Sequence, residues 1–171
     1  MKKTFFGLLI LALISSACQT KTETKRKFGE VIFDSAKLLK PDQAESLYSS
    51  IISIEKEFGS QLAIVIVDSV RGKTIEEYSL QTAERLNLGR DKYRDGLLMV
   101  LAIGQQKGKT EVGYGLERII TDEISGRITR EQMLPHFREG DFYGGFLAAV
   151  QKIHEHIKEN PQLIGKSLRD K

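Results

Sequence analysis

Tryptophan is absent from this sequence of 171 residues, which also has a single cysteine and only three histidines. One cysteine excludes an intramolecular disulfide framework. A four-ligand zinc site would require that cysteine and all three histidines to converge, which their scattered positions disfavour. The formal net charge is only +3 and no block of Lys and Arg stands out, so nucleic acid is not an expected partner.

What is present is the composition of an ordinary globular protein. Apolar residues make up 40% of the chain and charged residues 29%. This length and this balance suit one domain with a substantial core and are too small for two. These totals also exclude collagen, coiled coils, membrane proteins with several spans and fully disordered chains.

The first 18 residues have the features of an export signal. Two lysines follow Met1, and residues 5–14 form an apolar run of ten residues that ends before small residues and Cys18. As a helix, such a run is about 15 Å long, half of the roughly 30 Å hydrocarbon core of a bilayer. The segment 1–17 is therefore predicted to be a signal peptide and not a transmembrane anchor.

The residues before Cys18 resemble the bacterial lipobox, in which signal peptidase II cleaves before a cysteine that carries lipid. Ser15 departs from that pattern, because leucine is usual at its position. The resemblance implies a protein held by lipid on Cys18 to a membrane of the cell envelope, on the periplasmic or the surface face. The alternative is a soluble exported protein that is cleaved near Ala17 and keeps a free cysteine.

Residues 18–28 are predicted to be a flexible tether, because residues 19–27 include no apolar side chain. Loss of residues 1–17 removes two lysines and no acid, so the net charge falls from +3 to +1. The basic run at residues 25–27 either contacts anionic headgroups or is simply solvated.

Strand and helix patterns alternate along the rest of the chain. Apolar runs and a hairpin partner predict strands at residues 31–33, 62–67, 97–103 and 110–113. Helices are predicted at residues 41–58, 74–86, 121–126, 129 onward and 143–159. The signals are apolar stripes, capping boxes that begin at Thr74 and Thr129, and a Pro or Gly at several helix ends. Pro135 is expected to bend or end the fourth of these helices.

The order β-α-β-α-β-β-α-α predicts an α/β fold, a three-layer α/β/α sandwich around a mixed central sheet of about four strands. The β-α-β crossovers are expected to be right-handed. The domain is assigned to residues 29–160, and residues 161–171 to a C-terminal tail. Ile64 and Ile66 are expected on one face of a central strand that helices cover on both sides.

Sequence templates for catalysis are mostly missing. The chain has no Gly-x-Ser-x-Gly elbow, Walker loop or His-Glu-x-x-His motif. His154 and His156 are two residues apart, so a helix would point them in different directions and they could not chelate one metal ion. His136 follows Pro135 and is interpreted as a helix-end residue favoured by the helix dipole.

Acidic residues at the ends of predicted elements are the candidates for a site. Asp34 closes the first strand, Asp95 opens the third and Asp141 precedes the last helix, with Glu117 after the fourth strand. The predicted hairpin should bring Asp95 close to the turn at residues 113–117. Carboxylates on loops suit a hard cation such as Ca²⁺ or Mg²⁺. The competing interpretation is that each acid caps a helix or a turn.

Five short motifs in order carry a resemblance to a known family. The motifs lie at residues 31–36, 59–67, 95–98, 112–117 and 135–141. Together they resemble the TPM domain, also called the TPM phosphatase domain, over about residues 29–158. This family includes plant thylakoid-lumen proteins and many exported bacterial proteins.

The resemblance implies an α/β/α sandwich on the non-cytoplasmic side of a membrane. It also implies a divalent-metal site, with Ca²⁺ in some members, and an acid phosphatase activity attributed to some plant members. Carried over by motif, the expected metal ligands are Asp34, Asp95 and Asp141. The chain departs from the family at residues 86–89, where an aromatic residue is common before the glycine. It also has Asp95-Gly96 instead of the usual Asn-Gly, and the added charge should favour a cation.

Two classes of function follow. The first is a non-catalytic, lipid-tethered accessory module that binds Ca²⁺ or Mg²⁺, or a protein partner of the envelope, through its acidic loops. The alternative is a metal-assisted acid phosphatase acting on phosphomonoesters, in which a cation neutralises phosphate oxygens and activates water. Arg138 would then clamp the phosphate, and Glu117 and Arg138 are the expected ligand-binding residues. No nucleophile or general acid is identifiable.

Overall fold

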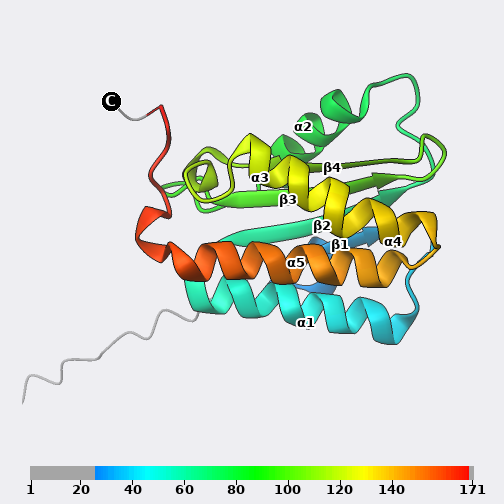
Figure 1. Cartoon of the computed structure of the whole chain (residues 1–171), viewed down its shortest axis with the longest axis horizontal. Coiled ribbons are helices and arrows are strands. Elements are labelled where there is room, and N and C mark those ends of the chain that lie inside the picture. Colours follow the sequence, from blue (N-terminus) through cyan, green and yellow to red (C-terminus); the bar gives the residue numbers. More distant parts are fainter. Residues whose placement is uncertain (1–25, 170–171) are drawn as a thin grey trace, which may run out of the picture.

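The computed structural model describes residues 26–169, and Figure 1 shows one sheet covered by helices. The sheet has the strand order β1 (Ile32–Asp34), β2 (Gln61–Val67), β3 (Gly96–Ala102) and β4 (Lys107–Val112). β1, β2 and β3 are parallel, and β4 pairs antiparallel with β3. The predicted mixed sheet of four strands is therefore confirmed.

The helices are α1 (Pro41–Phe58), α2 (Ile75–Leu86), α3 (Asp122–Arg127), α4 (Leu134–Arg138) and α5 (Phe142–Glu159).

Local chemistry sets several helix ends. α1 begins at Pro41, whose fixed φ suits the first turn of a helix. It ends where Gly59 adopts a left-handed conformation with a φ of 80°. Before α2, the backbone N–H of Glu77 donates to the Thr74 hydroxyl and the Glu77 carboxylate accepts from the N–H of Thr74. The capping box predicted at Thr74 is confirmed.

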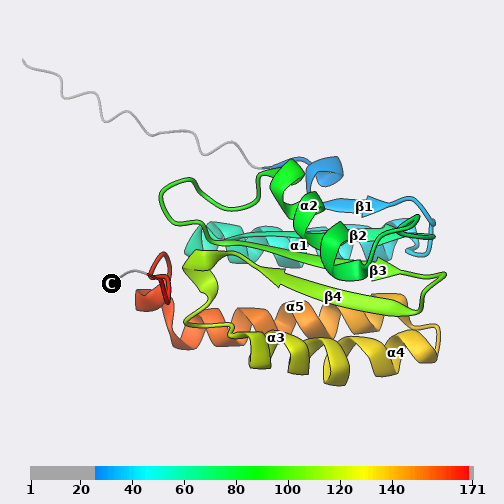
Figure 2. The same cartoon turned by 90° about the horizontal axis from the view of Figure 1, so that it is seen from above.

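Alternation along β2 separates two hydrophobic cores. Leu62, Ile64 and Ile66 belong to the larger core, with the apolar stripes of α1 and α5. Ala63 and Val65 point to the other face and belong to a smaller core with α2. Figure 2 shows α2 on one side of the sheet and α3, α4 and α5 on the other. The three layers and the shared face of Ile64 and Ile66 are as predicted.

The two crossovers between parallel strands have opposite hands. The steps from β1 to β2 and from β2 to β3 go in the same direction across the sheet, so crossovers of one hand would place α1 and α2 on the same face. The two helices lie on opposite faces. The expectation of right-handed crossovers is therefore wrong for one of them. α1 packs beside α5 and buries its apolar stripe in the larger core.

The capping box predicted at Thr129 does not start a helix, and this prediction is wrong. Thr129 lies inside a π-helical segment, Ile128–Met133, that joins α3 to α4. Its hydroxyl donates to the carbonyl of Ser125 and lies 3.0 Å from the hydroxyl of Thr110 on β4. These buried bonds satisfy the side chain without capping. Pro135 is accommodated in the first turn of α4.

The amino ends and the carboxyl ends of the parallel strands form two opposite borders of the sheet, at opposite ends of the molecule. Asp34, the last residue of β1, pairs with Ile66 near the end of β2. Asp95 precedes Gly96, which pairs with Gln61 at the start of β2. About six residues of strand, roughly 20 Å, separate the two levels. The end with Asp34 is called the C-terminal edge below, and the end with Asp95 the N-terminal edge.

Both ends of the described chain pack on the domain. Arg26 pairs with Glu55 at 2.9 Å and donates to the carbonyl of Leu62 at 2.8 Å, so this residue of the predicted tether is docked and not solvated. In the predicted tail, Ser167 is only 1% exposed. No helix within residues 26–169 is long and apolar enough to cross a membrane.

Candidate functional site

Asp95 is a buried carboxylate at the N-terminal edge whose neighbours fill its hydrogen-bonding capacity. The backbone N–H of Arg90 donates to Oδ1 at 2.9 Å, and the Arg90 guanidinium donates to Oδ2 from Nε at 3.0 Å and from Nη2 at 2.6 Å. The Ser60 hydroxyl also donates to Oδ2, at 3.3 Å. The side chain of Asp95 is 0% exposed and that of Arg90 is 33% exposed. This pair ties a loop to the sheet and leaves no oxygen open to a metal ion.

The hairpin brings the Asp95 loop to the predicted turn at residues 113–117. The N–H of Gly113 donates to the carbonyl of Gly96 at 2.8 Å. The expected proximity is confirmed for the backbone, whereas the Asp95 carboxylate binds Arg90 and not this turn.

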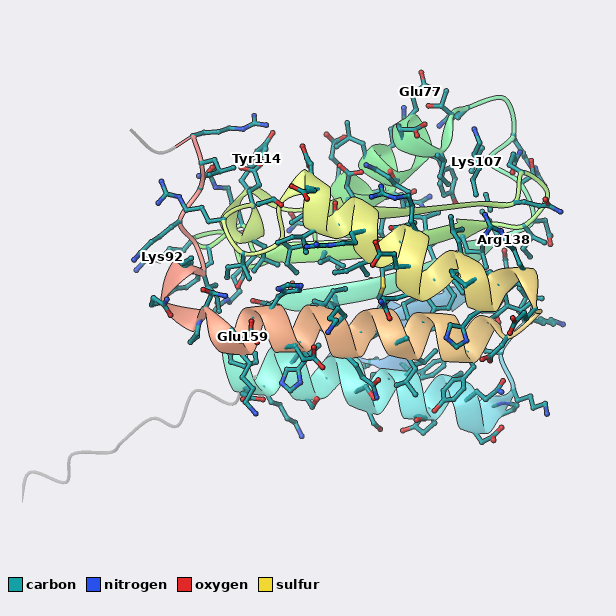
Figure 3. All side chains as sticks on the ribbon, viewed as in Figure 1. Glu77, Lys92, Lys107, Tyr114, Arg138 and Glu159 are labelled. Atoms are coloured by element: carbon teal, nitrogen blue, oxygen red, sulfur yellow. The ribbon has the colours of Figure 1, made fainter. Side chains whose placement is uncertain are left out.

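Glu117, an expected ligand-binding residue, contacts the C-terminal segment. The Ser167 hydroxyl donates to its Oε2 at 3.4 Å, and Nη2 of Arg169 lies 3.8 Å from its Oε1. Arg138, the other expected ligand-binding residue, is exposed in the last turn of α4. Figure 3 shows Arg138 and Tyr114, which is close to Glu117 in the chain, at opposite ends of the molecule. The structure does not bring Glu117 and Arg138 together.

Asp34 lies at the C-terminal edge and uses only one carboxylate oxygen. Its Oδ2 accepts from the N–H of Leu39 at 2.9 Å, which closes the loop before α1. Its Oδ1 is buried and has no hydrogen-bond partner within residues 26–169. Asp34 lines a surface hollow, called the Asp34 hollow below, whose walls include Phe28, Lys37, Leu39, Pro41 and Glu45.

A second hollow at the C-terminal edge was not found from the sequence. This Ser69 hollow follows β2, and its walls include Ser35, Asp68, Ser69, Arg71, Lys73 and Tyr78. The Ser69 hydroxyl accepts from the Gln105 side chain at 3.1 Å and from the N–H of Arg71 at 3.2 Å. The available signal was a polar and basic stretch directly after a buried parallel strand, where α/β sheets commonly bind ligands.

Asp141 caps α5, in agreement with the interpretation that the acidic residues cap helices or turns. Its Oδ1 accepts from the N–H of Gly144 at 2.9 Å, and its Oδ2 lies 2.9 Å from Nδ1 of His136. The Gly144 N–H and then the His136 ring hold the pKa of the Asp141 carboxyl below its ordinary value. His136 is in the last turn of α4, as expected for a helix-end residue.

The three aspartates expected as metal ligands lie at two ends of the molecule. Asp95 is at the N-terminal edge, while Asp34 and Asp141 precede helices that begin together at the other end, where the hydroxyls of Ser46 and Tyr143 are 3.0 Å apart. Within residues 26–169, no group of three or more His, Cys, Asp or Glu side chains could hold a metal ion. Of the three aspartates, Asp34 is the one with a buried oxygen that has no hydrogen-bond partner among the described residues.

Comparison with known proteins agrees with this fold. A family model described as the TPM domain matches residues 32–156. No curated protein matches the chain. The solved N-terminal domain of a protein from P. gingivalis is 29% identical, with a TM-score of 0.70, and the match covers 77% of this chain and 83% of that one.

Two further solved structures are similar at 13% identity, which shows the fold alone. One is the N-terminal domain of a protein from Corynebacterium glutamicum, with a TM-score of 0.63 over 86% of this chain and 89% of that one. The other is a protein from the psychrophilic bacterium Bizionia argentinensis, with a TM-score of 0.62 over 71% of this chain and 82% of that one.

Proposed function

Because the chain belongs to the TPM domain family, we propose that it is a non-catalytic accessory module of the bacterial cell envelope that binds a divalent cation in the Asp34 hollow. In this proposal, lipid on Cys18 holds the module to a membrane. Cys18 lies outside the described residues, so this part rests on the sequence pattern. The observation that carries the binding role is the buried Oδ1 atom of Asp34, for which the described part of the chain supplies no hydrogen-bond partner.

The surroundings of this oxygen favour a weakly held hard cation. A buried polar atom without a partner is costly, and native proteins satisfy nearly all such atoms. Ca²⁺ prefers carboxylate oxygens, and Glu45 lines the same hollow as Asp34. Lys37 borders it too, and its charge opposes a cation. Binding is therefore expected near the dissociation constants of extracellular calcium modules, about 0.1–1 mM.

The Asp34 hollow also offers apolar surface to a protein partner of the envelope. Phe28 is 39% exposed, and Leu39 and Pro41 border the hollow beside it. A cation that neutralises Asp34 and Glu45 would lower the cost of covering this surface. In a pull-down of the intact lipoprotein, the same envelope protein should be recovered in Ca²⁺ and lost in chelator.

Thermal unfolding in Ca²⁺ and in chelator tests the cation site. A ligand at ten times its dissociation constant stabilises the folded state by about 1.4 kcal/mol, which raises the Tm of such a domain by a few degrees. Asp34→Asn should remove this gain. Asp141→Asn, a matched change at the same end of the molecule, should keep it. A wild-type Tm that is equal in Ca²⁺ and chelator contradicts the site.

The Ser69 hollow favours the second candidate, a metal-assisted acid phosphatase. Arg71, Lys73 and Ser69 line it, and basic and hydroxyl side chains suit a phosphate. Asp68 lines it too, and its charge opposes an anion. Hydrolysis of a phosphomonoester that falls with chelator, with Lys73→Met and with Asp34→Asn would favour the enzyme. A rate equal to that of a mock preparation would favour the non-catalytic module.

A further inference from the structure

Basic and tyrosine side chains gather at one corner of the N-terminal edge, away from both hollows. Three segments form this basic corner: the loop before β3, the turn after β4 and the end of the described chain. Its exposed basic side chains are Lys92, Arg94, Arg118, Lys166 and Arg169. Figure 3 shows Lys92 and Tyr114 at this corner, with Lys107 and Arg138 at the opposite end of the molecule.

Packing interactions hold the basic corner together. The ring of Tyr114, 41% exposed, has the guanidinium of Arg169 at 4.1 Å and that of Arg94 at 5.5 Å from its centroid. The N–H of Gly165 donates to the carbonyl of Gly115 at 2.9 Å. The corner is therefore a preformed surface, with cations arranged around an exposed aromatic ring.

A second tyrosine supports the other side of the corner. Lys92 lies 5.6 Å and Arg90 3.9 Å from the ring centroid of Tyr93. Nε of Arg118 donates to the carbonyl of Ser167 at 3.1 Å, which fixes the C-terminal segment over the turn.

The charge of the corner exceeds that of the whole processed chain. The same segments also hold two acidic side chains, Asp91 and Glu117, and the ion pair between Arg90 and Asp95, whose charges cancel. The chain from Cys18 onward carries a formal charge of only +1, so the rest of the molecule has a slight excess of acids. Figure 3 shows the acidic Glu159, the last residue of α5, at the same end of the molecule as Lys92 and Tyr114.

The described chain begins at the same end of the molecule. Arg26 pairs with Glu55, whose Oε1 accepts from the side chain of Gln61 at 3.2 Å. Gln61 in turn accepts from the N–H of Gly89 at 3.0 Å, at the base of the loop before β3. Arg26 follows Cys18 by eight residues, which reach at most about 28 Å.

We propose that the basic corner rests on an anionic phospholipid surface and that this contact sets the orientation of the domain on its membrane. The orientation rests on the proposed lipid at Cys18, whereas the affinity of the corner for anionic lipid does not. A tether that reaches at most about 28 Å keeps this end close to the bilayer and to its surface potential. Exposed tyrosine and arginine side chains suit the headgroup region, because they join an apolar body to a polar tip. The Asp34 and Ser69 hollows, at the opposite edge, then face away from the membrane.

Vesicle binding tests the surface without the lipid anchor. The chain from residue 18 onward with Cys18→Ser keeps every residue of both cores, which lie between Val31 and Ile164, so it retains the folded domain. It is mixed with vesicles of phosphatidylglycerol and phosphatidylethanolamine, or of phosphatidylcholine alone. Binding to the anionic vesicles should be strong at low salt, weaken in 0.5 M salt, and be absent with phosphatidylcholine.

Two triple variants of equal charge locate the contact. The corner variant carries Lys92→Glu, Lys166→Glu and Arg169→Glu, and each lost cation should weaken binding about fivefold. A control variant carries Lys40→Glu, Lys107→Glu and Arg138→Glu, at exposed positions away from the corner.

The corner variant should lose at least about a hundredfold in partitioning, and the control variant should bind nearly as the wild type does. Cooperative thermal unfolding of both variants shows that they are folded. If the two variants lose the same affinity, or if wild type binds neutral and anionic vesicles alike, the proposal is overturned.

The absence of tryptophan allows a single fluorescent reporter of orientation. Tyr114→Trp at the corner and Lys107→Trp at the opposite end are each introduced into the acylated full chain. With anionic vesicles, emission from position 114 should shift to the blue and be quenched by brominated lipid, while that from position 107 should not change. Equal quenching at both positions contradicts the orientation even if vesicle binding is observed. If the chain is not acylated at all, the vesicle assay on Cys18→Ser still tests the corner.

Discussion

At the scale of single residues, Asp95 shows how a carboxylate with the sequence features of a ligand can be a structural group. Replacing it with alanine leaves the Arg90 guanidinium without its partner in a partly buried position. Asp95→Ala should therefore cost about 3 kcal/mol in the free energy of unfolding, the lower part of the range for broken buried pairs, since Arg90 keeps some contact with water. Urea unfolding measures this cost.

The neighbouring exposed Asp91 provides the control for Asp95. Asp91→Ala, in the same loop, should change the free energy of unfolding by less than about 0.5 kcal/mol. Equal stability of the two variants would show that the pair between Arg90 and Asp95 does not hold the loop.

Asp141 gives a prediction about pH. Its carboxyl has a lowered pKa in the folded state, because the ionised form accepts from the Gly144 N–H and bonds to His136. The unfolded carboxyl, near the ordinary value of 3.8, therefore binds protons at a higher pH than the folded one. The stabilisation is complete above about pH 5, begins to fall near the unfolded pKa and is lost as pH falls through the lower folded pKa. The Tm difference between wild type and Asp141→Ala should shrink between pH 6 and pH 3, and a constant difference would contradict this linkage.

The sequence could predict the cap at Asp141 but not the partner of Asp95. A cap involves residues three positions apart, and its pattern is local. Arg90 reaches Asp95 only because the loop folds back at Gly89, whose φ is 98° and where a Cβ atom would lie 2.5 Å from the backbone nitrogen of Gly96. That closure depends on tertiary packing.

At the scale of elements, the central position of β2 can be tested at Ile64. This side chain is fully buried in the larger core, so Ile64→Asp would place an unpaired carboxylate there. The cost of several kcal/mol is comparable to the whole stability of a domain, about 5–15 kcal/mol. Circular dichroism should show no cooperative thermal transition for Ile64→Asp. Ile64→Val, which should lose only about 0.5–1.5 kcal/mol, is the control, and cooperative melting of Ile64→Asp would contradict the buried position.

Strands and long helices could be predicted because their apolar patterns are local and strong. The apolar run of β2 and the apolar stripe of α1 each indicate that the element is buried. Neither pattern indicates which face of the sheet α1 covers. The hand of a crossover depends on which core receives the helix, and α1 joins α5 from more than 80 residues later in the chain. The π-helical segment Ile128–Met133 was missed for a similar reason, since Thr129 bonds to Thr110 on β4.

At the scale of the whole molecule, the predicted resemblance to the TPM domain is confirmed by the family match over residues 32–156. The described chain has two ends with different chemistry. The C-terminal edge carries the hollows beside Asp34 and Ser69, and the N-terminal edge carries the basic corner and the start of the described chain at Arg26. In the proposed orientation, with the basic corner on the membrane, both hollows face away from it.

The tether itself gives the last prediction. Each methylene that an acyl chain buries in the bilayer contributes about 0.8 kcal/mol. One acyl chain gives only marginal membrane binding, whereas two or more anchor a protein stably. Cys18→Ser should therefore release the processed protein from membranes or leave the precursor uncleaved, as fractionation and the mass of the N-terminal peptide would show. The basic corner adds an electrostatic attraction, so released protein should still bind membranes at low salt and leave them in 0.5 M salt. If correctly processed Cys18→Ser stays on membranes at high salt, the lipid anchor is wrong and another attachment holds the domain.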